Sequence, residues 1–304
     1  MKRFFVVSID TEADCSKGWL MRYPFQTVGV THGVKDVLTP LFRKYGVRPT
    51  YLLAHEILKD DKAMEVLRNI PDCELGTHLH WHDPERFPYH DRMQRYFVQG
   101  HFSYEEEFLQ MKQLTDLFRE KTGYPPISFR AGRFGAGENT GKILTELGYK
   151  IDTSVTPHIR HKCPYAGDIA DYTDAEEAPH HIREDGDLRY SGNGSLLEVP
   201  VTIWMRRRYW APSSLPAKSP AWFRPGYMNR YEMLLRLLFA GKMKIINVMF
   251  HNVESVPGLS AYAQNEQEMK KYLADLSAVL HLASSLGYEF VTLSELLPRL
   301  NEIL

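Results

Sequence analysis

The stretch Phe4-Phe-Val-Val-Ser-Ile-Asp10-Thr-Glu12 decides the fold class, because a near-continuous apolar run ends there in two acidic residues. A run of this kind is typical of a strand that is buried on both faces, as in a parallel sheet covered by helices. A second stretch, Glu74-Leu-Gly-Thr-His78-Leu-His-Trp-His82, leads a short strand directly into a histidine cluster. Two imidazoles four residues apart, at His78 and His82, together with a distant carboxylate predict a divalent-metal site.

Short β-branched or aromatic runs alternate with longer segments of helical period along most of the chain. The predicted strands span residues 4–9, 49–54, 72–76, 127–130, 148–152, 196–202, 244–250 and 287–292. The predicted helices span residues 33–45, 62–68, 103–122, 139–147 and 266–286, and a closing helix begins at Ser294. This alternation predicts βα units around a parallel sheet or barrel.

One domain is predicted to span residues 1–304. Length alone would fit one large α/β barrel or two small domains, but no linker, internal repeat or low-complexity tract divides the 304 residues. The alternation breaks between about residues 157 and 226, where prolines and the basic-aromatic run Arg206-Arg-Arg-Tyr-Trp210 occur. We interpret this stretch as a loop-rich insertion that contains one strand.

Composition narrows the class of partner and the compartment. A formal net charge of −1 argues against a dominant nucleic-acid or membrane-surface partner. Three cysteines without close pairing, Cys15, Cys73 and Cys163, indicate neither a disulfide framework nor a CxxC zinc site. The apolar run that stops at Asp10 is too short for a signal peptide, and no stretch reaches the roughly twenty apolar residues of a membrane span. We therefore expect a cytoplasmic chain without a transmembrane segment.

The polar residues of interest follow predicted strands, and they are Asp10, Glu12, His78, His82, Arg130, Asp152 and His251. In parallel α/β folds, active sites are built at the carboxyl ends of the strands. A hydrolytic metal site combines three imidazole or carboxylate ligands with an exchangeable water. His78 and His82 would supply two ligands. Asp10 and Glu12 would supply one ligand and one base, in either order, and His251 is the candidate acid.

Each of these residues also has a plainer interpretation. A carboxylate after a strand is more often a helix cap, and a histidine pair at this spacing is commonly incidental, so the prediction depends on the clusters falling together at strand ends. The aromatic residues of the insertion either stack on sugar rings or only pack the insertion onto the barrel. They are Trp204, Tyr209, Trp210 and Trp222.

The order of five motifs resembles the polysaccharide deacetylase family, also called the NodB homology or carbohydrate esterase family 4. The motifs are Ser8-Ile-Asp10-Thr-Glu12, Gly76-Thr-His78-Leu-His-Trp-His82, Phe129-Arg130-Ala-Gly-Arg-Phe134, Asp152-Thr-Ser and Val248-Met-Phe-His251. The resemblance implies a deformed (β/α)7-type barrel with the insertion before its last strands. It also implies that Asp10 is the base, and that Glu12, His78 and His82 hold a divalent metal. Zinc is expected, with Co²⁺, Ni²⁺, Mn²⁺ and Fe²⁺ as alternatives.

The resemblance also assigns roles to the later motifs. Arg130, which begins the family's Arg-x-Pro-Tyr motif, is expected to orient the base carboxylate. Asp152 is expected to help orient the acid, His251. The sequence departs from the family at Leu79, where a serine or threonine is usual and His80 is the candidate replacement. It departs again after Arg130, where the motif's proline is missing.

The function implied by the resemblance is removal of an N-acetyl or O-acetyl group from a sugar, with a metal-bound water as nucleophile, Asp10 as base and His251 as acid. The expected substrate is an N-acetylated sugar, a nucleotide- or lipid-linked saccharide, or a polysaccharide. No nucleic-acid partner is expected. Two alternatives stay open: hydrolysis of another amide, such as a ring ureide, and a non-catalytic carbohydrate-binding protein. The oligomeric state is not predicted.

Overall fold

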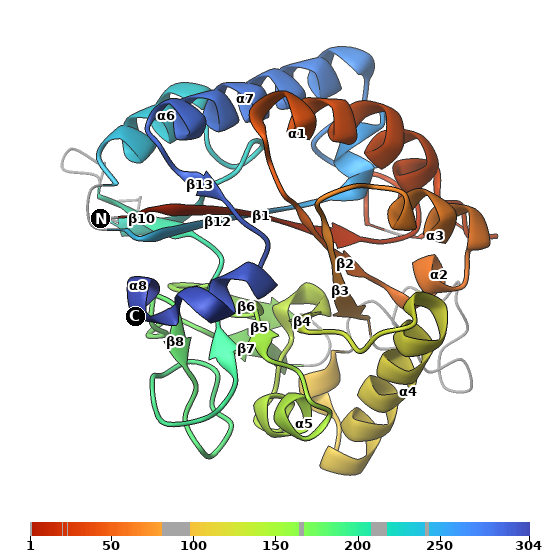
Figure 1. Ribbon diagram of the computed structural model, residues 1–304, viewed down its shortest axis with the longest axis vertical. Helices are drawn as coiled ribbons and strands as arrows, with labels where there is room; N and C mark the ends of the chain where they lie inside the picture. Colours follow the sequence, from red (N-terminus) through yellow and green to blue (C-terminus); the bar gives the residue numbers. More distant parts are fainter. Residues whose placement is uncertain are drawn as a thin grey trace.

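The computed structural model describes residues 2–19, 21–22, 24–80, 98–163, 167–207, 218–240 and 243–304. Within them, helices surround a strongly curled sheet (Figure 1). The strand order in the sheet is β12-β1-β2-β3-β4-β5-β9-β8, and β13 also pairs with β1. The pairs from β12 to β9 are parallel, whereas β8 runs antiparallel to β9. Parallel strands need helical crossovers, and this accounts for the alternation in the sequence.

The elements have the following bounds. The strands of this sheet are β1 (Phe4–Thr11), β2 (Thr50–Leu53), β3 (Glu74–Leu79), β4 (Ser128–Ala131), β5 (Ile151–Asp152), β8 (His180–His181), β9 (Leu197–Glu198), β12 (Ile245–His251) and β13 (Glu289–Phe290). The α-helices are α1 (Thr39–Tyr45), α2 (His55–Leu58), α3 (Asp61–Arg68), α4 (Tyr104–Thr122), α5 (Thr140–Glu146), α6 (Arg230–Leu238), α7 (Glu266–Ser285) and α8 (Leu300–Ile303). A π-helical segment, Gly29–Leu38, runs into α1, and shorter 3-10 segments cover Gln99–His101, Gly132–Phe134, Asn252–Ser255 and Ser294–Arg299.

Strand β1 is buried along its whole length, as the opening stretch predicts. Phe5, Val7 and Ile9 pack into the main hydrophobic core, whereas Phe4 and Val6 pack into a second core on the other face. The alternation of side chains along a strand separates the two sets, so both faces of the sheet are covered.

The two ends of the sheet are joined by hydrogen bonds between the segment after β9 and strand β12. The backbone N–H of Thr202 donates to the carbonyl of Asn247 on β12, at 3.0 Å. The Asn247 side chain then donates to Thr153 Oγ1 at 2.9 Å and to the Val199 carbonyl at 3.2 Å. These contacts close the curled sheet into a deformed barrel, and the predicted fold class is confirmed.

The insertion contains more regular structure than predicted, and the interpretation of one strand between loops is wrong. Two antiparallel pairs lie in or beside it: β6 (Arg160–Cys163) with β7 (Gly167–Asp171), and β10 (Ile203–Arg207) with β11 (Lys218–Trp222). The prolines obscured this pattern. Pro220 sits within β11, which is tolerated because both strands of a two-stranded ribbon are edge strands.

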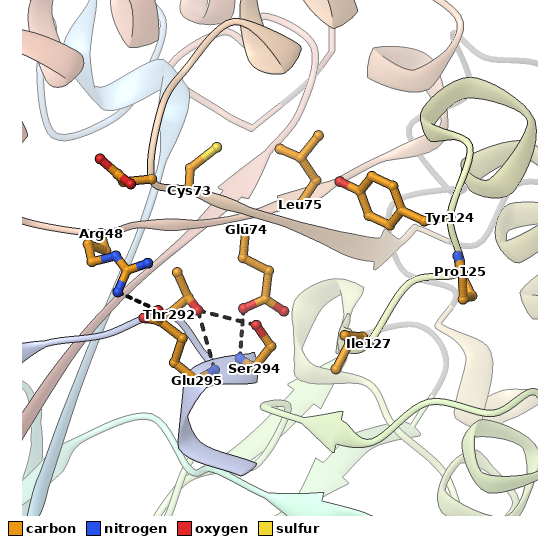
Figure 2. Close-up of a pocket in the computed structure, with 11 residues that line it drawn as sticks. Arg48, Cys73, Glu74, Leu75, Tyr124, Pro125, Ile127, Thr292, Ser294 and Glu295 are labelled. Atoms are coloured by element: carbon orange, nitrogen blue, oxygen red, sulfur yellow. Dashed lines mark hydrogen bonds and ion pairs between the residues drawn. The ribbon is translucent and has the colours of Figure 1, made fainter. Parts of the chain in front are cut away.

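The amino-terminal ends of the strands are closed by the end of the chain. A cavity of about 280 Å³ lies there. Figure 2 shows Glu74 among the residues that line it. The Glu74 carboxylate accepts hydrogen bonds from the Ser294 backbone N–H at 2.7 Å, from Ser128 Oγ at 2.7 Å and from Thr50 Oγ1 at 3.2 Å. These bonds tie the last helical segment to β2, β3 and β4, at the end of the barrel opposite to the predicted site.

The longer helices lie outside the barrel. α1 and α7 lie side by side over one side of the sheet, and α4 and α5 lie together on another (Figure 1). Among the described residues, we find no helix that combines the length and the apolar character required to cross a membrane.

Candidate metal centre

The carboxyl ends of three neighbouring parts of the sheet bring the predicted site residues together. Asp10 on β1 stands opposite His251 on β12, and His78 on β3 stands opposite Arg130 on β4. Asp10 and Glu12 are two residues apart, so the period of the strand directs both toward the same side. The predicted gathering of these side chains at strand ends is what the structure shows.

Glu12, His78 and His80 form a tight triangle of ligand atoms. Glu12 Oε1 lies 3.1 Å from His78 Nε2 and 3.0 Å from His80 Nε2, and the two nitrogens are 3.0 Å apart. His78 lies within strand β3, where residues two apart share a face, and this brings His80 to the same point. His82, the predicted ligand, lies outside the described residues.

This donor set suits a divalent metal. Two imidazoles and one carboxylate are a common ligand set of catalytic zinc, which leaves a fourth position open. Bonds of about 2.0–2.2 Å in tetrahedral geometry would separate ligand atoms by about 3.3 Å, close to the triangle found here. His78 Nδ1 lies 3.0 Å from the carbonyl oxygen of Arg130, so it donates there and leaves Nε2 as the ligand nitrogen.

The charges at the triangle favour a bound cation. Burial would raise the pKa of Glu12, but His80, His78 and His251 together hold the pKa well below its usual value. Burial would lower the pKa of His78, whereas Asp10 and Glu12 raise it above the usual value. Glu12 is therefore a carboxylate anion at neutral pH. Together with Asp10, it places negative charge at this end of the barrel, and this charge attracts a cation.

Asp10 is committed to Arg130 through one of its oxygens. Asp10 Oδ1 lies 2.5 Å from Arg130 Nη1. The fully buried guanidinium also donates to Ser8 Oγ at 2.7 Å and to the Thr153 carbonyl at 2.9 Å, so its orientation is fixed. Burial would raise the pKa of Asp10, but Arg130, then His78 and His251, hold it below the usual value.

The second oxygen of Asp10 faces the site. Asp10 Oδ2 lies 3.8 Å from His78 Nε2 and 3.9 Å from His251 Nε2. His251 Nε2 is also 3.8 Å from Glu12 Oε1. An ionised carboxylate with one free oxygen beside a metal-ligand triangle is placed to accept a proton.

His251 is held from behind by Glu254, a residue that the sequence reasoning missed. Glu254 Oε1 lies 3.0 Å from His251 Nδ1 and forms an ion pair with Arg224, which is also buried. Burial would raise the pKa of Glu254, but Arg224 and His251 lower it. The indole of Trp19 packs on the imidazole, with ring centroids 4.5 Å apart. The only signal in the sequence was an acidic residue three positions after His251.

The backbone beside Glu12 is fixed by two further residues that the sequence did not single out. Asn252 accepts from the Glu12 backbone N–H at 2.9 Å and donates to the Glu12 carbonyl at 3.0 Å. Glu56 Oε1 accepts from the N–H of Ala13 at 3.2 Å. These bonds hold the Glu12 side chain in position beyond the end of β1.

Asp152 supports a neighbouring turn rather than His251. Its Oδ1 accepts from Ser154 Oγ at 2.7 Å, and the same Ser154 oxygen accepts from the Ala131 backbone N–H at 2.9 Å. Asp152 thereby steadies the start of the turn that follows Arg130. The contact with His251 that we expected of Asp152 is made by Glu254 instead, because Glu254 follows His251 within the same local turn.

The turn Gly132–Phe134 explains the missing proline. A Cβ at Gly132 would lie 2.5 Å from the Leu79 carbonyl oxygen and 3.0 Å from His80 Nδ1, so only glycine lets this turn pass the end of β3. Arg133 and Phe134 follow with φ of 55° and 56°, a conformation that costs free energy in non-glycine residues. The turn thus packs against His80 and directs Phe134 into the adjoining cavity.

Asp152 and Glu198 form a buried carboxyl pair on neighbouring strands β5 and β9. Burial, and then Asp152, raise the pKa of Glu198 well above its usual value. Burial also raises the pKa of Asp152, although a hydrogen bond with Glu198 offsets part of that rise. Two adjacent buried carboxyl groups do not both ionise readily, so the raised pKa of Glu198 makes it keep its proton, and its hydrogen bond to Asp152, to higher pH than an exposed glutamate would.

This pair predicts a pH-dependent stability. The pKa of Glu198 is higher in the folded protein than its unfolded value of 4.5, so protonation of this group stabilises the fold. This contribution to the free energy of unfolding is fully present below pH 4.5 and is lost as pH rises through the folded pKa. Urea unfolding from pH 5 to 8 should show wild-type stability falling, relative to Glu198→Gln, by up to about 1.4 kcal/mol per pH unit. The glutamine keeps a donor for Asp152 but does not titrate. Parallel pH profiles for the two proteins would contradict the assignment.

An aromatic cavity of about 310 Å³ adjoins His251. Its lining includes Trp19, Arg133, Phe134, His161, Lys162, Trp222, Arg224, Tyr227, His251 and Tyr262. Of the insertion aromatics singled out in the sequence, Trp222 lines this cavity, whereas Trp204 packs against Phe223 with ring centroids 4.7 Å apart. Tyr209 and Trp210 lie outside the described residues.

Comparisons with known proteins establish the fold. No family model and no curated protein matches the sequence. Among solved structures, a protein from Mycobacterium smegmatis that is described as a polysaccharide deacetylase has a TM-score of 0.59 at 13% identity. The match covers 100% of this chain and 93% of that one. Puue allantoinase has a TM-score of 0.58 at 15% identity, covering 99% and 90%. A GH57-type branching enzyme from Pyrococcus horikoshii has a TM-score of 0.53 at 12% identity, covering 99% and 71%.

These likenesses confirm the resemblance at the level of the fold. The same barrel carries a deacetylase, an allantoinase and a branching enzyme, so the fold leaves the reaction open. The side chains at the carboxyl ends of the strands determine the reaction.

Proposed function

We propose that this chain is a metal-dependent hydrolase that removes acyl groups, foremost N-acetyl groups, from a sugar. The observation that carries the proposal is the convergence of Glu12, His78 and His80 within 3.1 Å of one another, beside an ionised Asp10 and an oriented His251. Acyl transfer to water needs a site that stabilises an oxyanion, a base and an acid, and these residues offer all three.

Glu12 and His78 would hold the metal, with a third ligand from His80 or from the predicted His82. Glu12 is the better candidate ligand, because one oxygen of Asp10 is already committed to Arg130. A bound divalent cation would polarise the acyl carbonyl and make a water molecule more acidic. Glu12 would therefore act as the metal ligand, and Asp10, paired with Arg130, would remain available as the base.

The proton transfers fall to Asp10 and His251. Asp10 Oδ2 would accept the proton of the attacking water, and Arg130 would keep this carboxylate ionised before the reaction. His251 Nε2 would donate a proton to the departing amine as the C–N bond breaks, with Glu254 holding Nδ1. Amide and water thereby become a carboxylic acid and an amine, and the enzyme is restored when Asp10 returns its proton to His251 through solvent.

The cavity beside His251 supports a sugar as the substrate. Aromatic faces bury the apolar side of a pyranose ring, and Trp19, Phe134 and Trp222 contribute such faces. A volume of about 310 Å³ suits one sugar unit, at the small end of ligand pockets. A nucleotide- or lipid-linked saccharide presents a single terminal unit, so we favour it over the interior of a long polymer.

The test combines metal content with acetate release. The purified chain should bind one equivalent of Zn²⁺ or a similar ion, and should release acetate from at least one member of a panel of N-acetylated and O-acetylated sugars. His78→Ala should lose both properties, since it removes a ligand. A chain that binds no stoichiometric metal, with His78→Ala unchanged, would support the non-catalytic alternative.

The third ligand can be assigned by comparing His80→Ala with His82→Ala. We expect His80→Ala to weaken metal binding by about 10²-fold or more, because its nitrogen already lies 3.0 Å from both other ligand atoms. Competition with a chelator measures this change. If His82→Ala alone releases the metal, the triangle is not the site, and the spacing in the sequence identified the ligand correctly.

A ring ureide is the second candidate substrate. The allantoinase and the protein described as a deacetylase match the fold equally well, with TM-scores of 0.58 and 0.59. The compact cavity would also accept a small planar ring. Allantoin and related ureides therefore belong in the same panel. Turnover of a ureide without acetate release from any sugar would replace the first candidate by the second.

A further inference from the structure

Helix α6 is apolar on two faces, although it lies on the outside of the molecule. Met233 and Leu237 are buried against the protein. Four other side chains form an exposed stripe at helical spacing, here called the α6 stripe: Tyr231 (76% exposed), Leu235 (55%), Leu238 (50%) and Phe239 (82%). Figure 1 shows α6 at the edge of the fold, beside α7. Exposed apolar side chains gathered in one stripe mark an interaction surface, so a second surface is expected to cover the α6 stripe.

The chain around α6 is strongly cationic. Residues 206–244 contain nine lysines and arginines and one acidic residue, a net charge of +8, whereas the rest of the chain carries −9, which together give the net −1. Within the described residues, Arg224 and Arg230 pair with Glu254 and Asp275, which lie outside the segment, and Arg206 and Arg236 share the single acidic residue of the segment, Glu232. The net charge of the whole chain therefore concealed a segregation of charge, and it is no argument against a membrane-surface partner.

We propose that the α6 stripe and its surrounding cations dock on the surface of an anionic lipid bilayer. Leucine, phenylalanine and tyrosine side chains insert at the boundary of headgroups and acyl chains, while lysines and arginines are attracted to anionic headgroups. Lys218, which is exposed, and Arg206, Arg236 and Lys244 are described cations of this segment. The pattern joins both features of an interfacial helix.

The other occupants fit less well. A second copy of the chain in a two-fold dimer would place two segments of charge +8 face to face. A nucleic acid would match the charge, but phosphates and base edges leave exposed leucines without a partner. An anionic bilayer satisfies the charge and the apolar stripe together.

Arg206 links α6 to the candidate active site, because it pairs with Glu232 on α6 and donates a hydrogen bond to the Tyr227 carbonyl at 3.4 Å. Tyr227 lines the aromatic cavity, is 46% exposed, and lies four residues before Tyr231 in the chain. Docking through α6 would therefore bring the cavity close to the bilayer surface, where a lipid-linked saccharide is presented. This consequence for the substrate rests on the proposed hydrolase activity, but the docking does not, and it is measured without turnover.

Co-sedimentation with vesicles tests the proposal. The full chain should sediment with vesicles of phosphatidylcholine mixed with phosphatidylglycerol, should bind phosphatidylcholine alone at least about tenfold more weakly, and should be released by high salt. Leu235→Ser combined with Phe239→Ser should lower the partition coefficient by about tenfold or more. Leu109→Ser is the matched control, because Leu109 is 54% exposed on α4 and should leave binding unchanged.

A spectroscopic reporter makes the result independent of the double variant's folding. Phe239→Trp should show a blue-shifted emission on addition of anionic vesicles and no shift with neutral ones, relative to the wild-type background. Absence of sedimentation with anionic vesicles, equal binding by the double variant, or a stable dimer in light scattering that the double variant abolishes would each overturn the proposal.

Discussion

Replacing Asp10 by asparagine should lower kcat by about 10³-fold while the metal content stays unchanged. The structure supplies the reason: Asp10 Oδ1 is held by Arg130, and Oδ2 faces His78 and His251 at 3.8 and 3.9 Å. The pKa of Asp10 is held below its usual value, so the wild-type carboxylate is ready to accept a proton at neutral pH. Asparagine keeps the size of the side chain and can accept no proton. Steady-state kinetics and elemental analysis of the same preparation check both parts.

The matched comparison for Asp10 is Glu12→Gln. That variant should lose the metal, because Glu12 is the proposed ligand, and its activity should return only at high metal concentration. Asp61→Asn, at a carboxylate whose side chain is 92% exposed, should behave as the wild type. If Asp10→Asn releases the metal and Glu12→Gln retains it, the roles of the two carboxylates are reversed.

Glu254→Gln should lower kcat by about 10³-fold, even though Glu254 is placed behind His251 rather than at the reacting atoms. Loss of the carboxylate that orients a catalytic histidine costs up to about 10⁴-fold in other hydrolases. The loss should fall on kcat with KM little changed, because Glu254 contacts His251 Nδ1 and does not line the aromatic cavity. Arg224 loses its buried partner, so the free energy of unfolding should fall by about 3 kcal/mol.

Kinetics of the folded variant separate positioning from a loss of structure. Destabilisation alone would lower activity in proportion to the unfolded fraction measured by circular dichroism, whereas loss of the contact behind His251 lowers kcat of the fully folded variant. Glu232→Gln is the matched control, since Glu232 pairs with Arg206 and Arg236 at a partly exposed site. It should leave kcat unchanged. An unaltered kcat in the fully folded Glu254→Gln variant would show that Glu254 does not act through His251.

The residues on strands were the most predictable part of the site. Asp10, Arg130 and His251 come at or near the ends of strongly patterned apolar runs, and parallel strands bring such ends to one edge of a sheet. Their gathering therefore followed from local pattern and from the topology that the pattern implies. The predicted ion pair between Arg130 and Asp10 is present for the same reason.

The third ligand was less predictable, because the same histidines suit two conformations. A spacing of four favours His78 with His82 when the segment is helical, but β3 extends through His78 to Leu79, and a strand places His80 beside His78. The extension depends on pairing with β4, which is distant in the sequence. Which period governs a short segment is a tertiary decision.

The sequence by itself determined that this chain is an α/β barrel with acidic residues and histidines at its strand ends, because apolar periodicity is a local property that records burial. Only the tertiary structure decided the supporting contacts: Glu254 with Arg224 behind His251, Ser154 between Asp152 and the Ala131 turn, and the exposed stripe on α6. These depend on which surfaces meet across long separations in the chain. Hydrogen-bond geometry and solvent exposure are properties of the packed chain, and periodicity does not encode them.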